Sequence, residues 1–599
     1  MIPKTIREMG VGPVRTPIFV KNLNRRALKK ISGIGQGYEA IDIYYINKEI
    51  SAGCESAIRK AGASLNNVNF HLFPNEYFNC EGELCAASST LIKSPAFQKL
   101  LQSSQDCFDV GADHLTAGVQ KSLVYIISDD FKLFFLAKKL GMFERAIFLV
   151  AEIEILSILF PDCRMLKEGG SFKRMCFTFG IFTLMLFKIL FHRGRRLKQG
   201  IKQAILFDPS YDFVNGANPE FKAFYRYFKD RDDVTYICRR GKTGVRSFLE
   251  SEARPIAIVS WGVRGLGNKL KQLLKTLSLA RIVILAGIGW SLKCAIAKTK
   301  LKEMYFSSLF ETLKPKIYLQ VRSDLDPAHP IATGIIEKHG GINVGYMTGS
   351  YFIQTQHFYT IDFHIYGLLG TYFKDQVYRS VWPENICYIL AGSITSETAG
   401  HDREKEPRFA VSMATTSFGN DIWMQEDDYK ECIESFFYAV SGMKGEMALR
   451  EKDPRGELVE TFVRSCADRY SVNFTLSTPW DVTEEGIHSS YSDEFIMDSG
   501  IIVIMGTSTM GWEALGLLKK FVIFGQKGIP HPFEDIEPRL VVRTREDLRE
   551  RLNWLSTMPE VEYRTMVKPL LDRMCKESTG NMVEKFIGEA LSLRERGVV

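Results

Sequence analysis

The segment from Ile501 to Phe524 constrains the fold most, because it places two apolar strands and a helix within one short stretch of chain. Ile501 to Met505 are continuously apolar and largely β-branched, which is typical of a strand covered on both faces. A turn of small residues follows, then a helical stretch and a second apolar run, Phe521 to Phe524. This spacing predicts neighbouring parallel strands joined by a helix, and therefore an α/β sheet.

The turn after the first of these strands has the chemistry of an anion site. Gly506, Thr507, Ser508 and Thr509 bring backbone N–H groups, hydroxyls and the positive end of a helix to the carboxyl edge of the sheet. Glu513 follows one helical turn later and could accept hydrogen bonds from a ribose. Two plainer interpretations stay open, since Ser and Thr are common helix N-caps and Glu513 could be a solvated helix residue.

Composition excludes some classes of protein. At 599 residues the chain is too long for one core, and roughly two to four domains are expected. A net charge of +7 is modest for this length and gives no support for nucleic-acid binding. The 12 cysteines contain no CxxC pair, and the closest two, Cys80 and Cys85, have no further ligands at zinc spacing. We therefore expect no metal site and a reduced, cytosolic compartment, and the first residues lack the apolar core of a secretion signal.

One stretch breaks the globular pattern. Cys176 to Phe187 carries no charge, and after Lys188 the apolar run continues to Phe191. The basic residues around it are Lys173, Arg174, His192, Arg193, Arg195, Arg196 and Lys198. The pattern predicts a helix over residues 171–200 that lies in the interface of an anionic membrane. A buried core helix with a charged exit and a single transmembrane pass remain alternatives, although a pass needs about 20 apolar residues.

Strand-like runs alternate with helical stretches from residue 201 onward, which predicts parallel sheets. The first series comprises Ala204 to Phe207, Ile256 to Ser260, Arg281 to Ala286, Lys316 to Gln320, Ile342 to Tyr346 and Ile386 to Leu390. The second series comprises the run from Arg408, Glu446 to Arg450, Val472 to Leu476, Ile501 to Met505, Phe521 to Phe524 and Leu540 to Val542.

These series define the predicted domains. Residues 201–391 form a first Rossmann-like domain, the polar segment 392–407 a linker, and residues 408–599 a second Rossmann-like domain that ends in three helices after Thr544. Residues 1–170 form an α/β region of unclear role, in which Ala40 to Tyr45 and Ser122 to Ser128 are expected strands. The fold class is thus α/β, with two Rossmann-like domains and an additional N-terminal region that carries the membrane-associating helix.

At this point the chain resembles the GT-B glycosyltransferases, and more narrowly the bacterial surface-carbohydrate and CDP-glycerol glycerophosphotransferase-like group. The group's G-S-S-T-x-x-x-E-A-x-x-x-G-K-P-V-I signature resembles the stretch from Gly506 to Ile523, and its V-G-x-Q-H-G turn resembles Val344-Gly-Tyr-Met-Thr-Gly349. The resemblance covers roughly residues 205 to 595 and implies transfer from a nucleotide-sugar or a CDP-polyol to a glycan or lipid-linked acceptor. It also implies a metal-independent reaction without a cofactor, in the synthesis of a cell-surface polysaccharide or glycolipid on the inner face of the cell membrane.

The resemblance implies a donor site in the second domain. Thr507, Ser508 and Thr509 would bind the phosphates after Gly506, and Glu513 the ribose. Arg450, Lys452 and Arg455 stand where relatives place a basic phosphate ligand, and a solvated loop is the alternative for each. The donor candidates are therefore Gly506, Thr507, Ser508, Thr509, Glu513, Arg450, Lys452 and Arg455.

The first domain would supply the acceptor side and the base. Gly262, Arg264, Gly265 and Gly267 form a loop after a strand, although tight strand-to-helix turns need glycine in any case. The candidates for the base are Asp324, His339 and His357, and a lone histidine is more often structural. Asp324 follows the strand KIYLQ at the carboxyl edge.

One departure from the group concerns its Gln-His pair. Met347 and Thr348 replace these residues here, and Gln356 and His357 are candidates to take over their role. A displaced site, a different donor or lost activity would each explain the change. Besides the transferase, a nucleotide-sugar 2-epimerase and a catalytically degenerate GT-B protein that acts as an assembly partner therefore stay open.

Overall fold

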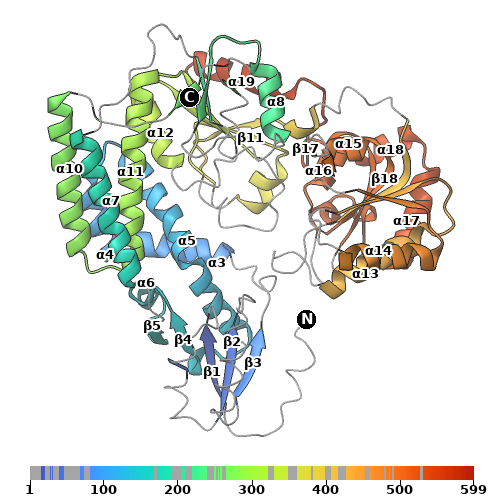
Figure 1. The fold of residues 1–599 in the computed structure, drawn as a ribbon, viewed down its shortest axis with the longest axis horizontal. Coiled ribbons are helices and arrows are strands. Elements are labelled where there is room, and N and C mark those ends of the chain that lie inside the picture. Colours follow the sequence, from blue (N-terminus) through green and yellow to red (C-terminus); the bar gives the residue numbers. More distant parts are fainter. Residues whose placement is uncertain are drawn as a thin grey trace.

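The computed structural model describes most of the chain. The described residues are 15–20, 27, 30–31, 40–45, 68–72, 81–167, 171–191, 204–208, 219–238, 249–250, 254, 256–258, 263, 265–321, 329–347, 361–379, 382–397, 406–415, 426–451, 457–477, 481–483, 486–488, 492–506, 508–525 and 531–598. In this part of the chain, three parallel sheets follow one another along the sequence, and a group of long helices stands at one end of the molecule (Figure 1).

The N-terminal region contains a five-stranded parallel sheet in the order β3-β2-β1-β4-β5. Its strands are β1 (Thr16–Val20), β2 (Ile41–Tyr45), β3 (Val68–Leu72), β4 (Ile147–Val150) and β5 (Arg164–Lys167). Its helices are α3 (Glu81–Lys93), α4 (Pro95–Gln105), α5 (Ala112–Lys139), the short η3 (Phe143–Arg145) and α6 (Ile153–Leu159). The strand expected at residues 40–45 is confirmed as β2, whereas the strand expected at Ser122 to Ser128 is wrong, because this segment lies inside α5.

Four further helices pack between this region and the first large sheet or on their outer side. They are α7 (Ser171–Phe191), α10 (Leu266–Leu285), α11 (Trp290–Leu313) and α12 (His329–Lys338). α12 packs on β10 (Ile342–Tyr346) of that sheet, α11 on α12 and α5, and α7 and α10 on α11. The strand expected at Arg281 to Ala286 is wrong, because these residues end α10. Its apolar side chains Leu279 and Val283 lie four residues apart and are buried together, as helical spacing requires.

The first large sheet has seven parallel strands in the order β12-β11-β10-β9-β6-β7-β8. The strands are β6 (Ile205–Asp208), β7 (Val234–Cys238), β8 (Ile256–Ile258), β9 (Ile317–Val321), β10 (Ile342–Tyr346), β11 (Ile365–Leu368) and β12 (Cys387–Leu390). The helix α8 (Pro219–Phe228) and the short η5 (Phe373–Val377) and η6 (Ile394–Glu397) accompany them. Since β6 comes first and later strands are added on both sides, the sheet is doubly wound, as expected for a Rossmann-like domain.

The second large sheet has six parallel strands in the order β15-β14-β13-β18-β19-β20. The strands are β13 (Phe409–Ala414), β14 (Met447–Arg450), β15 (Phe474–Ser477), β18 (Ser499–Met505), β19 (Lys520–Phe524) and β20 (Val541–Val542), beside a small hairpin of β16 (Asp481–Thr483) and β17 (Gly486–His488). Its helices are α13 (Glu426–Val440), α14 (Glu457–Tyr470), α15 (Ser492–Met497), α16 (Met510–Gly516), α17 (Arg545–Thr557) and α18 (Glu560–Val567), with the short η8 (Pro532–Asp535), η9 (Pro538–Leu540) and η10 (Lys568–Leu570). The predicted fold class, two Rossmann-like domains with an N-terminal region, is confirmed.

The C-terminal helix α19 (Met582–Glu595) returns to the first large sheet, where it contacts α8, β12 and η6. The chain crosses between the sheets just before this helix: the Ser578 N–H donates to the Gly516 carbonyl (2.8 Å) and the Lys576 N–H to that of Leu369 (3.0 Å). By packing, α19 therefore belongs with the first domain, although sequence order had grouped it with the second.

His114 joins the N-terminal region to the first large sheet. Its Nδ1 lies 2.7 Å from Oδ2 of Asp362, and its Nε2 lies 3.3 Å from Oε2 of Glu337. Burial lowers the pKa of His114, but its hydrogen bonds with Asp362 and Glu337 leave that pKa raised above its ordinary value. A raised folded pKa gives stability that is complete below about pH 6.5 and is lost as the pH rises through the folded pKa.

We therefore expect His114→Gln to cost about 1 kcal/mol at pH 6 and progressively less above pH 7. Thermal unfolding at a series of pH values measures this. His339→Gln is the control, because the pKa of His339 is lowered. Removing His339 should therefore not reduce the loss of stability that the parent protein shows as the pH rises. If the stability of His114→Gln fell with rising pH as steeply as that of the parent protein, the raised pKa of His114 would be contradicted.

Candidate functional site

The candidate site lies where the winding of the second large sheet reverses. β13 pairs with β14 on one side and with β18 on the other, so the helices after these strands leave on opposite faces. At such a point the carboxyl ends of the strands leave room for a ligand. Here β14 ends at Arg450, β13 leads to Thr415, and β18 leads to Gly506.

The turn after β18 has the backbone geometry that its sequence predicts. Gly506 adopts φ +61°, which glycine tolerates without strain, and its N–H donates to the Phe524 carbonyl at 2.9 Å. Ser508 and Thr509 are half-buried, and the Ser508 hydroxyl accepts from the Met510 N–H at 3.4 Å. Thr509 occupies the N-cap position of α16 without a side-chain capping bond. Thr507 lies outside the described residues.

Glu513 is buried at this turn. Its side chain lies in the first turn of α16 and is only 6% exposed, so the alternative of a solvated helix residue is wrong. Burying a carboxylate is costly, and buried ionisable groups are frequent at ligand sites.

A second carboxylate, Asp493, lies close enough to interact electrostatically with Glu513. It lies near the beginning of α15, which leads into β18 and contacts α16, and it too is buried. Burial, and then the charge of Glu513, raises the pKa of Asp493 to about 7. We did not predict Asp493, because an acidic residue at a helix start is common and only the packing of α15 on α16 brings it to the site.

This raised pKa predicts a pH-dependent effect of Asp493→Asn. The folded pKa lies above the ordinary value, so the stability that the protonated form provides is complete below about pH 4 and is lost as the pH rises through about 7. The stability of the variant relative to the parent protein should therefore rise by about 2–3 kcal/mol between pH 5 and pH 8. Denaturant titrations at both pH values measure the gain, with Asp547→Asn in α17 as control. An equal difference from the parent protein at both pH values would contradict the raised pKa.

Arg450 supplies a buried positive charge at the same edge of the sheet. It ends β14, is only 7% exposed, and places its guanidinium 5.6 Å from the ring centroid of Phe495 in α15. Burial rules out the solvated-loop alternative for Arg450, while its contact with a phosphate stays a prediction. Lys452 and Arg455 lie outside the described residues.

The carboxyl edges of the two large sheets meet at this site. Phe373, which follows β11 of the first sheet, lies 6.0 Å from Trp512 of α16 between ring centroids. The Tyr372 hydroxyl donates to Oδ2 of Asp535 at 3.0 Å, and Tyr372 and Asp535 belong to different domains. Trp512 is fully buried and directly precedes Glu513, so this contact fixes the position of α16 against the first domain.

The structure describes only some of the candidate residues of the first domain. Asp324, His357, Gly262 and Arg264 lie outside the described residues. His339 follows α12 and precedes β10, so it lies at the amino edge of the sheet, opposite to the proposed donor site. This position corrects the prediction of His339 as the base.

The acceptor-loop glycines lie at the beginning of α10. Gly265 adopts φ +77°, which explains a glycine at this position. Among the described residues outside the adjoining backbone, no atom lies within 4 Å of a Cβ built on Gly265 or Gly267.

Met347 stands where the resembling group has the first residue of its Gln-His pair. Its side chain is fully buried in the core of the two large sheets, and its N–H donates to the Gly367 carbonyl at 2.9 Å. Met347 therefore has no access to a substrate. Thr348 and Gln356 lie outside the described residues.

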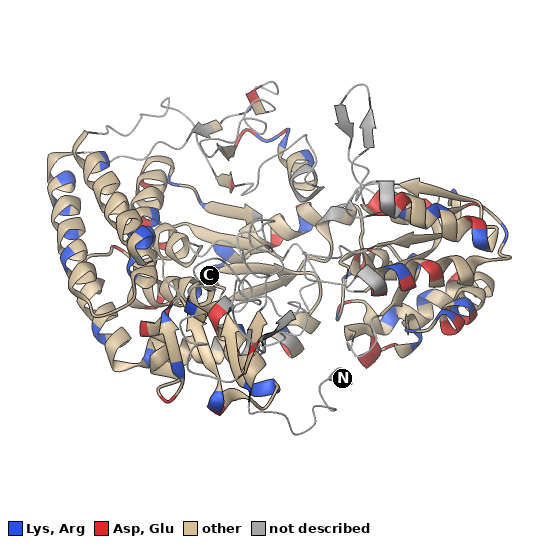
Figure 2. Ribbon diagram, turned by 60° about the horizontal axis from the view of Figure 1, so that its bottom comes forward, with Lys and Arg blue, Asp and Glu red and all other residues tan. Residues whose placement is uncertain are grey.

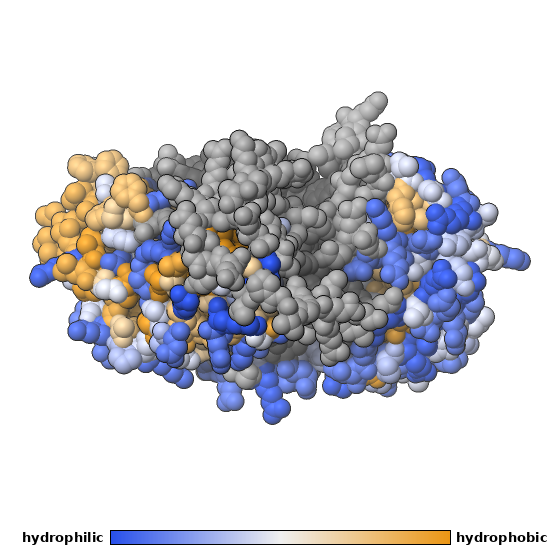
Figure 3. Space-filling model, turned by 90° about the horizontal axis from the view of Figure 1, so that it is seen from below, coloured by the Kyte–Doolittle hydropathy of each residue, from blue (hydrophilic) through white to orange (hydrophobic). Residues whose placement is uncertain are grey.

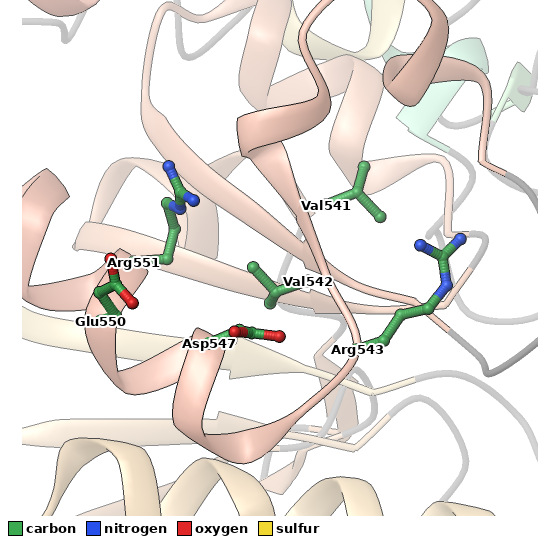
Figure 4. Close-up of a pocket in the computed structure, with 6 residues that line it drawn as sticks. All are labelled: Val541, Val542, Arg543, Asp547, Glu550 and Arg551. Carbon is green, nitrogen blue, oxygen red and sulfur yellow. The ribbon is translucent and has the colours of Figure 1, made fainter.

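A separate hollow of about 290 Å³ lies beside the edge strand β20. It is lined by Val541, Val542, Arg543, Asp547, Glu550 and Arg551, with the two arginines on opposite sides (Figure 4). Two carboxylates would repel an anionic donor there, and β19 separates the hollow from β18.

Among the described residues, no three His, Cys, Asp or Glu side chains are arranged to hold a metal ion.

Comparison with known proteins gives similarity to solved structures only. No protein-family model and no curated protein matches the chain. Similar solved structures include MurG from Acinetobacter baumannii, with 11% identity and a TM-score of 0.33 over 66% of this chain and 99% of that one. A glycosyltransferase from Rickettsia africae has 11% identity and a TM-score of 0.38 over 66% and 98%.

The UDP-GlcNAc 2-epimerase from Neisseria meningitidis, solved with UDP-GlcNAc bound, has 10% identity and a TM-score of 0.41 over 64% of this chain and 99% of that one. At these values neither the family nor the activity is decided by the similarity. The assignment of two Rossmann-like domains rests on the strand orders of the two large sheets.

Proposed function

We propose that this protein is a transferase that moves a glycosyl or polyol-phosphate group from a nucleotide-activated donor to a glycan or lipid-linked acceptor. The observation that carries the proposal is the turn at Gly506, which lies where the winding of the second large sheet reverses and is followed by the buried Glu513. A sugar nucleotide or a CDP-polyol is the donor class, and a cell-surface polysaccharide or glycolipid is the product class.

The described residues have the following roles in this proposal. N–H groups and hydroxyls at Ser508 and Thr509 bind the donor phosphates, and Arg450 supplies positive charge as the leaving nucleotide gains negative charge. Glu513 accepts hydrogen bonds from the ribose hydroxyls. The bond between the transferred group and the leaving phosphate oxygen breaks, and the acceptor oxygen forms the new bond and passes its proton to a base. Asp324 and His357 remain the candidates for this base, and the proposed reaction needs neither a metal ion nor a cofactor.

The burial of Met347 favours a second candidate, a GT-B protein that binds a nucleotide but has lost transfer. The position that carries a Gln-His pair in the resembling group begins here with a side chain enclosed in the core. The two candidates share the donor site and differ only in turnover. The 2-epimerase alternative shares the donor site as well but needs no acceptor.

A thermal-shift screen tests the proposal. The full chain is heated with nucleoside mono- and diphosphates and sugar nucleotides of each base, in EDTA and in Mg²⁺. A ligand present at 100 times its dissociation constant stabilises the folded state by about 2.7 kcal/mol, so one base should raise the unfolding temperature. Stabilisation that is equal in EDTA supports a metal-independent site. If none of the nucleotides gives stabilisation, the proposal is wrong; stabilisation without turnover on any acceptor favours the degenerate candidate, and turnover of the donor alone favours the epimerase.

A further inference from the structure

The helices α7 and α10 present exposed apolar side chains at one end of the molecule. The apolar face, as we define it, consists of Phe177, Leu184 and Phe187 of α7 and Leu266, Leu270 and Leu274 of α10, all of them exposed. α7 contacts α10, and the Lys269 ammonium donates to the Leu190 carbonyl at 3.0 Å. Figure 3 shows hydrophobic side chains gathered at this end, where Figure 1 places the two helices. Large exposed apolar surfaces of this kind mark interaction sites.

The opposite side of α7 is fixed to the protein. Ile181, Phe182, Met185 and Ile189 are buried, and α7 packs along α11. Arg174, near the beginning of α7, forms an ion pair with the buried Glu152, whose Oε1 also accepts from the Ser291 hydroxyl at 2.5 Å. In the described chain, Phe172–Phe191 is the only helix long and apolar enough to cross a membrane, and 28% of the tested window within it is buried. If α7 crossed a bilayer, its buried side chains would lose their packing against α11. The packing therefore favours a helix that lies on a surface.

The charges of both helices identify the kind of surface. Residues 171–191 and 266–285 contain no Asp or Glu. Their basic residues are Lys173, Arg174, Lys188, Lys269, Lys271, Lys275 and Arg281, and five more basic residues, counting His192, follow between 192 and 198 in the sequence. Figure 2 shows blue Lys and Arg positions along these helices. Asp109 pairs with Lys275, and Glu152 pairs with Arg174, so these two basic residues are partly neutralised. Helices that carry basic and no acidic residues beside an apolar face are complementary to an anionic lipid surface, and less so to a second copy of the same basic face.

We propose that α7 and α10 together form a docking face for an anionic membrane surface, with both helices parallel to the bilayer. The leucines of α10 and the phenylalanines of α7 enter the boundary between headgroups and acyl chains, while Lys173 and Arg281, both exposed, meet anionic headgroups. The sequence around residues 171–200 indicated α7 alone. The contribution of α10 comes from the structure, because its apolar stripe lies in a segment that we had expected to end as a strand. The protein is then peripheral on an anionic membrane surface.

Sedimentation of the full chain with lipid vesicles tests this inference. Vesicles of phosphatidylcholine with about 30% phosphatidylglycerol should pellet the protein at low salt, and pure phosphatidylcholine should pellet much less, since each basic residue near an anionic surface contributes about five-fold. The α10 variant Leu266→Ser/Leu274→Ser removes side chains that are 86% and 59% exposed. Partition should fall roughly ten-fold or more. The control Val561→Ser/Val598→Ser removes side chains that are 77% and 59% exposed elsewhere, and it should bind like the parent protein.

Lys173→Glu/Arg281→Glu should abolish the preference for anionic vesicles. The inference is overturned if the parent protein stays in the supernatant, if the α10 variant pellets like its control, or if alkaline carbonate fails to release the bound protein, as expected for a spanning helix. It is also overturned if light scattering shows a dimer that only the α10 variant dissociates, because the face is then a contact between copies. Vesicle binding needs neither donor nor acceptor, so its outcome is independent of the proposed transfer.

Discussion

Replacing Glu513 with glutamine should weaken binding of the donor nucleotide about 30-fold while the protein stays folded. The carboxylate is buried one helical turn after the Gly506 turn, where it can accept hydrogen bonds from two hydroxyls of a ribose. A hydrogen bond to a charged group contributes about 1.5–3 kcal/mol, and 2 kcal/mol corresponds to about 30-fold. Glutamine keeps the volume of the side chain but loses the charge and one acceptor. Titration calorimetry with the nucleotide selected by the thermal-shift screen measures the change.

Two further measurements make this prediction specific. Glu546→Gln removes a carboxylate from the first turn of α17 in the same domain, where the side chain is exposed, and it should leave binding unchanged. Glu513→Gln should also lower the pKa of Asp493, because the charge of Glu513 is one of its causes. Unchanged nucleotide affinity in Glu513→Gln would show that the ribose is bound elsewhere.

Replacing Trp512 with alanine should cost about 3–5 kcal/mol in the free energy of unfolding. The indole is fully buried. Its ring centroid lies 4.9 Å from that of Phe533 in its own domain and 6.0 Å from that of Phe373 in the first domain. Truncation leaves a cavity at the contact that positions α16, so the stability of the second domain and the placement of Glu513 are affected together. Denaturant unfolding followed by circular dichroism measures the loss.

Trp512→Phe is the matched variant. It keeps an aromatic ring at the contact and should cost less than about 2 kcal/mol. Trp512→Ala should also lower nucleotide affinity, whereas Trp512→Phe should largely preserve it. A cost below about 1 kcal/mol for the alanine variant would mean that the domain contact at Phe373 contributes little.

The fold was predictable where a strand is short, apolar and followed by a glycine turn, as at Ile501 to Gly506. It was not predictable where the same apolar pattern occurs inside a long helix. Arg281 to Ala286 and Ser122 to Ser128 are rich in Ile, Leu and Val, yet each is part of a helix of 20 or more residues, and periodicity over so few residues cannot separate the two. The return of α19 to the first sheet also has no local signal, because it depends on contacts far apart in sequence.

The site residues that could be predicted from the sequence are those that follow a predicted strand. Gly506, Ser508, Thr509 and Glu513 follow one strand, and the structure brings the end of β14, with Arg450, to the same sheet edge. Asp493 was missed, because it reaches Glu513 through the packing of two short helices rather than through sequence spacing. The position of His339 at the amino edge of its sheet follows from the predicted strand Ile342 to Tyr346, which begins three residues later and is confirmed as β10.

Hydrogen exchange with and without the selected nucleotide tests the central claim most directly. If the donor binds at the Gly506 turn, exchange should slow in peptides that cover residues 506–513 and the end of β14, and this protection should disappear in Glu513→Gln. Unchanged exchange over residues 506–513, with protection confined to the hollow at residues 541–551, would contradict the account.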